Sequence, residues 1–161
     1  MSEIKEILND KESILVFDVD GVLAKLEFGK YNHYEADDEV WNKNCENGIN
    51  LYNEKLVIKK MQDFLKEKDM SKVYVATKVG TKNEEKYKTA YLKKFYNIIE
   101  DNIYYVYDNV EKLSVLNKIK KRHNDIKEKN IVLIDDTVEV LTYIMCNSGY
   151  STVHISTFLD I

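Results

Sequence analysis

Two aspartates of this chain occupy a position that packing alone does not explain. Asp18 and Asp20 are separated by one residue. Asp18 directly follows the apolar run ILVF at 14–17, and Asp20 directly precedes Gly21. A run of this composition predicts a strand that is buried on both faces of a parallel sheet. Buried carboxylates are costly unless they are paired or bound to a metal ion. The pattern therefore indicates that an active site begins where this strand ends.

Two later apolar runs also end in polar side chains. Thr77 follows residues 73–76, and the pair Asp135 and Asp136 follows residues 131–134. Lys112 lies in the first turn of a predicted helix, where the positive end of the helix dipole disfavours a cation. A single lysine in such a place is usually just solvent-exposed. Its coincidence with three polar strand ends favours a functional role.

Carboxylates that converge on one point need a cation. Two unit negative charges about 4 Å apart repel each other by roughly 4 kcal/mol at an effective dielectric constant of about 20. Oxygen ligands of this kind suit Mg²⁺, which keeps several waters and takes a phosphate oxygen as a further ligand. The cation also screens the carboxylates from an approaching phosphate dianion. The sequence therefore predicts Mg²⁺ as the cofactor and a phosphorylated substrate.

The elements that carry these residues alternate along the chain. Short apolar runs predict strands at about 13–18, 73–76, 103–107, 131–134 and 152–155, and helical periods predict helices at about 54–65, 83–96, 110–123 and 137–148. Such alternation gives right-handed crossovers and a parallel sheet with helices on both faces. We therefore predict an α/β fold, a three-layer α/β/α sandwich around a parallel, Rossmann-like sheet of about five strands. Ligands of such sheets bind at the carboxyl ends of the strands.

The 161 residues are most simply one domain, residues 1–161, with a short flap or minimal cap within about 24–53. A leading helix is expected from Ser2, its cap, to Asn9, and Asn83 is expected to cap a later helix. The segment 24–53 shows no sustained period, so its structure is left open. It contains four aromatic residues that could stack on a base or sugar, although sealing the edge of the core is the favoured role: Phe28, Tyr31, Tyr34 and Trp41.

Four motifs in order resemble the haloacid dehalogenase superfamily, which consists mostly of phosphohydrolases. They are DVDGVL at 18–23, a strand ending in Thr77, a lysine that opens a later helix, and IVLIDDT at 131–137. The resemblance covers residues 14–155 and implies a phosphoric monoester hydrolase that forms an aspartyl phosphate. It implies Asp18 as nucleophile and Asp20 as general acid and base, with its backbone carbonyl on the metal. Thr77 and Lys112 would hold the phosphoryl oxygens.

Two assignments remain open, namely which acid of the last motif binds the metal directly and which lysine binds the phosphate. Asp136 is favoured as the direct metal ligand and Asp135 as a neighbouring or water-mediated one. Lys118 is the runner-up to Lys112, because motif spacing varies in this superfamily. Glu139 could join through water, although an acid in the first turn of a helix also suits the dipole. Lys78, beside the threonine, has no role assigned.

Substrate and setting are less constrained. The short 24–53 segment implies a capless or minimally capped enzyme whose open site suits a bulky phosphoester or larger metabolite, or an oligomer that supplies the lid. The alternatives are a polynucleotide-end phosphatase and a catalytically weak phosphate-binding or partner module. A signalling receiver domain is excluded, because its acidic pair follows the first strand. The net charge of −4 does not indicate nucleic acid binding, although local lysine patches leave it open.

Location and redox state follow from composition. No apolar run approaches the roughly 18 residues of a membrane span, and the first residues do not resemble a signal peptide, so a cytoplasmic protein is expected. Cys45 and Cys146 match no metal-binding or redox motif and are expected to be reduced and at least half-buried. The oligomeric state is left open.

Overall fold

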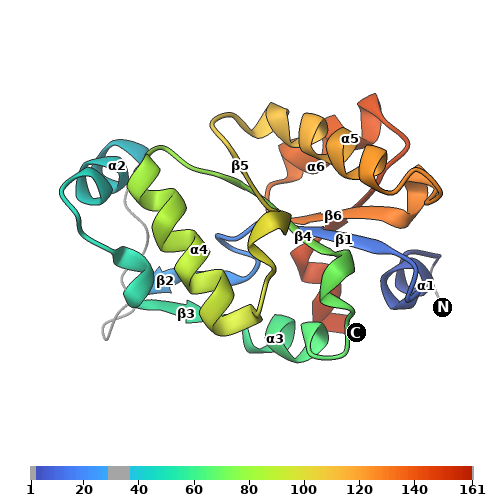
Figure 1. The fold of residues 1–161 in the computed structure, drawn as a ribbon, viewed down its shortest axis with the longest axis horizontal. Helices are drawn as coiled ribbons and strands as arrows, with labels where there is room; N and C mark the ends of the chain where they lie inside the picture. Colours follow the sequence, from blue (N-terminus) through green and yellow to red (C-terminus); the bar gives the residue numbers. More distant parts are fainter. Residues whose placement is uncertain (1–2, 29–36, 161) are drawn as a thin grey trace.

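Five parallel strands form the centre of the computed structural model, which describes residues 3–28 and 37–160 (Figure 1). Their order across the sheet is β5-β4-β1-β6-β7, so the strand that precedes Asp18 lies in the middle. Neighbouring strands all pair in parallel, as predicted. The bounds are β1 Ile14–Phe17, β4 Val73–Lys78, β5 Ile103–Val106, β6 Ile131–Asp135 and β7 Ser151–His154.

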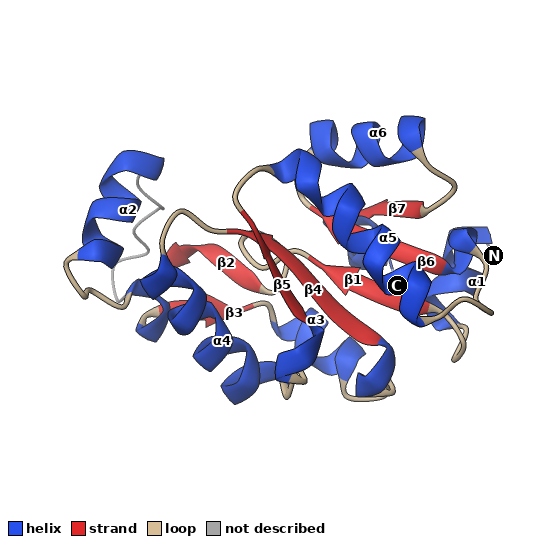
Figure 2. Cartoon of the chain, turned by 45° about the horizontal axis from the view of Figure 1, so that its top comes forward, coloured by secondary structure: helices blue, strands red, loops and turns tan. Residues whose placement is uncertain are grey.

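Helices cover both faces of this sheet and complete the three predicted layers (Figures 1 and 2). Leu15 and Phe17 of β1 pack into one buried cluster, with Ile14 and Val16 in the other, as alternation along a strand requires. The first cluster includes residues of α1 (Glu3–Asn9), α3 (Lys59–Leu65) and α4 (Lys82–Tyr96), and the second includes residues of α5 (Lys112–Arg122) and α6 (Val138–Asn147).

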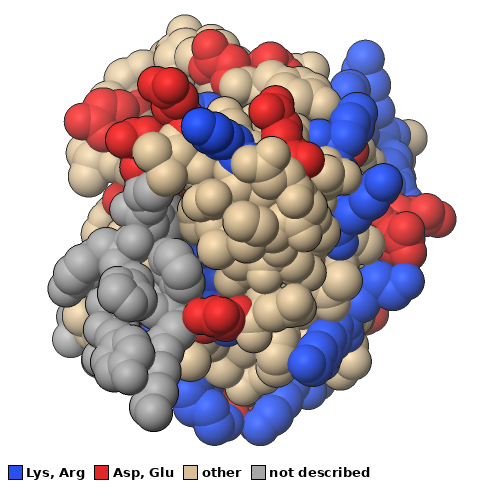
Figure 3. Space-filling view, turned by 90° about the vertical axis from the view of Figure 1, so that its left-hand side faces the viewer, with Lys and Arg blue, Asp and Glu red and all other residues tan. Residues whose placement is uncertain are grey.

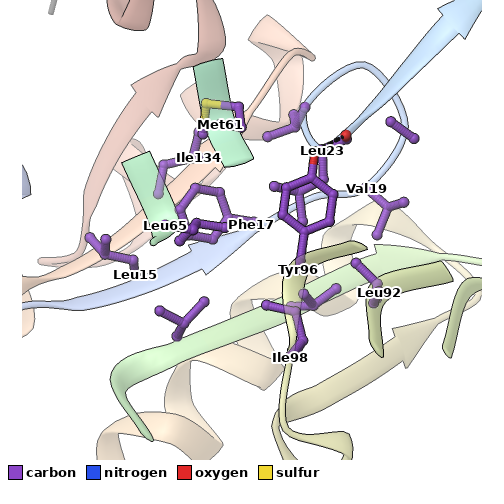
Figure 4. Close-up of a cluster of buried hydrophobic side chains, with 14 of the residues drawn as sticks. Leu15, Phe17, Val19, Leu23, Met61, Leu65, Leu92, Tyr96, Ile98 and Ile134 are labelled. Atoms are coloured by element: carbon purple, nitrogen blue, oxygen red, sulfur yellow. Dashed lines mark hydrogen bonds between the residues drawn. The ribbon is translucent and has the colours of Figure 1, made fainter. Parts of the chain in front are cut away.

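Figure 4 shows the first cluster at β1. Phe17 lies beside Met61 and Leu65 of α3, and Tyr96 of α4 lies close to Leu23, which follows the turn after β1. The Tyr96 hydroxyl donates a hydrogen bond to the Leu23 carbonyl, so α4 is tied to that turn. The turn that carries Asp20 therefore packs against the hydrophobic core.

A small insertion follows the turn after β1. Strands β2 (Ala24–Phe28) and β3 (Lys55–Val57) pair antiparallel in a second sheet, and α2 (Asp38–Glu46) lies between them in the chain. The predicted helix over 54–65 is wrong in its first part, because residues 55–57 form β3 and the helix begins only at Lys59. Val57 pairs with Ala24 across the small sheet, so strand pairing outweighs the helical spacing of the apolar residues.

Several local expectations change. Thr81, not Asn83, caps α4, since its side chain accepts a hydrogen bond from the Glu84 backbone. Cys45 is buried as expected, whereas Cys146 is exposed. The expected cap Ser2, together with Tyr31, Tyr34 and the Phe28 side chain, lies outside the described residues.

The helices and the surface charge bear on where the protein could act. Among the described residues, no helix combines the length and apolar character that crossing a membrane requires. The face that carries α2 and the small sheet shows acidic side chains toward its upper left and lysine or arginine side chains along its right and lower edges (Figure 3). This face therefore carries charge of both signs.

Candidate active site

The predicted site residues meet at the carboxyl ends of β1, β4 and β6. These three strands are neighbours in the sheet, so the side chains that follow them lie at one edge. A cavity of about 250 Å³ opens there, between the sheet edge and α2. Its lining includes Asp18, Asp20, Thr77 and Asp136. The structure thus brings together residues that are more than a hundred positions apart in the sequence.

Three carboxylates converge beside β1. One oxygen each from Asp18, Asp135 and Asp136 lies within 4.8 Å of the other two, and we call these residues the acidic cluster. Gly21 makes room for it. Its φ is +77°, which favours glycine, and a Cβ atom there would lie only 2.0 Å from Asp136 Oδ2. The glycine of the first motif therefore serves both the turn and the approach of the last motif.

Lys112 is the lysine that the fold places in this site. It is fully buried at the start of α5, with Nζ 3.1 Å from Asp18 Oδ2 and 2.7 Å from Asp135 Oδ2. Lys118, the runner-up, is exposed on the same helix, and Glu139 is exposed on α6. Lys112 therefore bridges the first and last motifs through Asp18 and Asp135.

The two acids of the last motif differ in their surroundings. Asp135 is fully buried, and its two oxygens accept from Lys112 Nζ and from the Thr137 backbone at 2.9 Å. Asp136 is partly exposed, lines the cavity, and accepts a long hydrogen bond of 3.3 Å from the Thr137 hydroxyl. Asp136 is thus the member of the pair whose carboxylate is more open to a ligand.

The acidic cluster is electrostatically incomplete. Burial raises the pKa of Asp18, with Lys112 opposing and the Asp135 carboxylate adding to the rise. Burial likewise raises the pKa of Asp136, and Asp18 and Asp135 add to it. Three carboxylates face one ammonium, so two negative charges lack a partner in the cluster. Oxygen donors with this charge fit a divalent cation, which would reverse these pKa shifts.

Asp20 turns away from the acidic cluster toward a set of donors that the sequence did not reveal. The Tyr52 hydroxyl lies 2.8 Å from both Asp20 oxygens, Lys55 Nζ lies 3.2 Å from Oδ1, and Lys88 Nζ lies 2.8 Å from Oδ2. We call these three residues the Asp20 clamp. Lys55 and Lys88 are both buried, and Lys55 also donates to the Lys25 carbonyl. The insertion and the core each contribute to holding Asp20.

The clamp keeps Asp20 ionised. Burial alone would raise the pKa of this carboxyl, but the ammonium groups of Lys88 and Lys55, together with their hydrogen bonds and that of Tyr52, lower it to about 2. The general-acid role that the resemblance implies for Asp20 requires this carboxyl to be protonated in the first step. The pKa values of the pair are separated in the opposite sense, with that of Asp18 raised.

Thr77 and the mouth of the cavity connect the sheet to α2. Thr77 is buried at the end of β4, and its Oγ1 lies 3.0 Å from Lys88 Nζ. Lys78, the next residue, points outward and pairs with Asp38 of α2 at 2.8 Å. Trp41 of α2 is buried and donates to Glu84 at 3.1 Å, which agrees with the favoured core role for this aromatic residue.

The sequence contained a signal for one residue of the Asp20 clamp, Lys88. Lys88 lies four residues after Glu84 and three before Tyr91, and all three are buried on α4. Residues at these spacings share one face of a helix. An inward helical stripe that contains one lysine and one glutamate indicates a buried ion pair, and this was missed.

The fold and the site together define a class: a doubly wound α/β domain with an acidic centre at the switch point of its parallel sheet. Within that class, the chain has the fold of the haloacid dehalogenase (HAD) superfamily, as the motifs predicted. The crystal structure of a HAD family enzyme from Bacteroides thetaiotaomicron, a magnesium complex, matches it with a TM-score of 0.53. The match covers 90% of this chain and 93% of that chain at 14% sequence identity. No protein-family model and no curated protein matches the sequence.

Proposed function

We propose that this protein is a Mg²⁺-dependent phosphatase that hydrolyses a phosphate monoester through an aspartyl phosphate. The observation that carries the proposal is the meeting of a strand-end aspartate, two further carboxylates and a buried lysine at one point beside the cavity. Thr77 lies at the adjacent strand end and lines the same cavity. The magnesium complex of the HAD family enzyme with a similar fold supports the choice of cation.

The residues that would hold the cation are Asp18 and Asp136, with the Asp20 carbonyl added by the HAD resemblance. Asp135 would support them from beside Lys112, because both of its oxygens already accept from the protein. A bound Mg²⁺ supplies charge neutralisation for the carboxylates and for the phosphate dianion. Without it, the two uncompensated negative charges of the acidic cluster would repel the substrate.

The chain's own groups perform the transfer. A carboxylate oxygen of Asp18 attacks phosphorus in line, the bond from phosphorus to the alcohol oxygen breaks, and an acyl phosphate forms on Asp18. Lys112 and the Thr77 hydroxyl stabilise the charge that spreads over the equatorial phosphoryl oxygens. Water then attacks the phosphorus of the acyl phosphate, which releases inorganic phosphate and regenerates the Asp18 carboxylate.

Asp20 has the proton-transfer role in this scheme. An ionised carboxylate suits the second step, in which Asp20 accepts a proton from the attacking water. The first step requires Asp20 to donate a proton to the leaving alcohol. An entering phosphate dianion raises the pKa of a nearby carboxyl, so substrate binding favours protonation of Asp20.

The sequence left several substrate classes open, and the size of the cavity favours a small phosphorylated molecule over a bulky phosphoester. Its volume of about 250 Å³ is bounded by α2 residues as well as the sheet edge. Its lining includes the amide side chains of Asn42 and Asn109, which can form hydrogen bonds with a ligand. We therefore propose a small phosphorylated metabolite with a hydrogen-bonding alcohol portion. The protein would work in the cytoplasm, and α2 with the small sheet would serve as a minimal cap.

The decisive experiment is a panel of phosphate monoesters, including p-nitrophenyl phosphate, assayed with Mg²⁺ and with EDTA. Asp18→Asn is expected to lower kcat by roughly 10³-fold or more, because it removes the nucleophile. It should also abolish binding of beryllium fluoride, which mimics the acyl phosphate. Asp63→Asn, the same change at an exposed position on α3, is the matched control. Full activity of Asp18→Asn would refute the mechanism, and an inert wild-type protein would favour the phosphate-binding module.

A further inference from the structure

Lys88 is a buried lysine of α4 that also lines the cavity. It is 1% exposed, and its Nζ lies close to four oxygen atoms. These are Asp20 Oδ2 at 2.8 Å, Thr77 Oγ1 at 3.0 Å, Glu84 Oε1 at 3.2 Å and the Lys78 carbonyl at 2.5 Å. A single side chain of α4 thus connects the ends of β1 and β4.

The donor count of an ammonium limits what Lys88 can do. Its three N–H groups already face four acceptors, so no donor remains for a substrate oxygen. This distinguishes it from Lys112, whose Nζ pairs with two carboxylates, those of Asp18 and Asp135. Lys88 is therefore placed to orient its neighbours rather than to bind phosphate.

The contact with Thr77 has a directional consequence. An ammonium has no acceptor, so Lys88 donates and Thr77 Oγ1 accepts. The hydroxyl hydrogen must then point away from Lys88. Within residues 3–28 and 37–160, the Thr77 hydroxyl makes no other hydrogen bond, and Thr77 lines the cavity. The hydrogen is left to face the space where a ligand would sit.

We propose that Lys88 is a positioning residue that turns the Thr77 hydroxyl hydrogen into the cavity, where it is donated to a phosphoryl oxygen. The assignment rests on the proposed function in one respect, the phosphate as occupant. A donor whose direction is fixed before the ligand arrives costs no reorganisation at the moment of reaction.

The position of Lys88 is itself fixed. Glu84 pairs with its ammonium and accepts from the Gly80 backbone at 2.8 Å and from Trp41 Nε1 at 3.1 Å. These donors come from the loop after β4 and from α2. Glu84 is therefore held by three groups, and Lys88 cannot move without disturbing a buried carboxylate.

A double-mutant cycle tests the proposal with tungstate, a phosphate mimic, as the probe in the presence of Mg²⁺. The variants are Lys88→Met, Thr77→Val and their combination, and calorimetry gives the dissociation constant of each. Lys88→Met should weaken tungstate binding about tenfold when Thr77 is present, the loss of one oriented hydrogen bond to an anion. With Val at position 77, the same change should have an effect of less than about twofold.

Two controls separate positioning from stability. Lys86→Met, the same substitution on the exposed side of α4, should leave tungstate binding unchanged. If Lys88→Met fails to fold, the cycle is repeated in a Glu84→Gln background, which removes one of the carboxylates that Lys88 balances. Equal fold-changes for Lys88→Met with Thr and with Val at position 77 would overturn the proposal.

The outcomes for the enzyme and for Lys88 can be told apart. A protein that binds tungstate with the expected coupling but hydrolyses no ester keeps the Lys88 assignment and loses the proposed function. Hydrolysis without coupling keeps the function and overturns the Lys88 assignment. A wild-type protein that neither hydrolyses esters nor binds tungstate overturns both.

Discussion

The two aspartates that follow β1 are separated by a single residue but lie in opposite charge environments. Asp18 belongs to the acidic cluster, where three carboxylates meet the single ammonium of Lys112. Asp20 and Glu84 are two carboxylates that meet two buried ammonium groups, those of Lys55 and Lys88, so that group is balanced.

This difference indicates which half of the site the protein completes by itself. Charges buried without partners are costly, so the balanced half is a fixed structure that needs nothing from solution. The unbalanced half has two negative charges in excess and is completed by a divalent cation and then a phosphate. The Asp18 carboxylate lies near Asp135 of β6 and pairs with Lys112, whereas the Asp20 carboxylate pairs with Lys88 of α4 and Lys55 of β3.

The largest expected effect is a loss of stability when a lysine of the balanced group around Asp20 and Glu84 is replaced. Lys55→Met should lower the free energy of unfolding by about 3–5 kcal/mol, because it leaves the Asp20 carboxylate with one buried charge partner fewer. Adding Mg²⁺ should recover little of this loss, since the Lys55 ammonium pairs with Asp20, which is not part of the acidic cluster. Urea unfolding with and without Mg²⁺ measures both quantities. Lys118→Met on the exposed side of α5 is the control, with a change within about 0.5 kcal/mol.

Lys112→Met provides the contrast to that prediction. It adds to the negative excess of the acidic cluster, so Mg²⁺ should recover a clear part of its stability loss. Equal recovery of Lys55→Met and Lys112→Met by Mg²⁺ would mean that the two halves are not electrostatically distinct.

The second prediction concerns the metal itself. Mg²⁺ at about 100 times its dissociation constant should raise the free energy of unfolding of the wild-type protein by about 3 kcal/mol. Asp136→Asn should lose most of this increment, whereas Asp20→Asn should keep it, because the Asp20 side chain is held by the clamp and its carbonyl is unchanged. Thermal unfolding of each variant, compared with its own metal-free form, gives the increments. Loss of the increment in Asp20→Asn alone would place the cation in the other half.

The elements that sequence reasoning predicted well are the ones with local signals. Strands β1, β4 and β6 are apolar runs buried on both faces, and each ends in or is followed by a polar residue at the carboxyl edge of the sheet. The order of the motifs then placed Asp18, Thr77, Lys112 and the Asp135–Asp136 pair together, as the structure does. Local composition and chain order were sufficient for these positions.

The insertion was not predictable in the same way. Strand β3 has only three residues, and its existence depends on pairing with β2, which lies about thirty positions earlier. Its residue Lys55 reads as a surface lysine, since nothing nearby in the sequence indicates that Asp20 is its partner. Buried ion pairs between distant residues have no local pattern, so the clamp required the structure. Lys88 is the exception, because the inward stripe of α4 marked it.

The smallest of these effects is a dependence of stability on pH that has opposite signs in the two halves. The pKa of Asp20 is lowered from an ordinary 3.8 to about 2, so its stabilising contribution is complete above pH 3.8 and is lost as the pH falls toward 2. This contribution is about 2 kcal/mol. The destabilisation caused by Asp20→Asn should therefore shrink by about that amount between pH 6 and pH 2.5 in urea titrations.

The opposite sign is expected for Asp136, whose pKa is raised. Without metal, the Asp136→Asn variant should gain stability relative to the wild-type protein as the pH rises. Parallel pH profiles for the two variants would show that both carboxyls meet the same environment, and the division between the halves would fail.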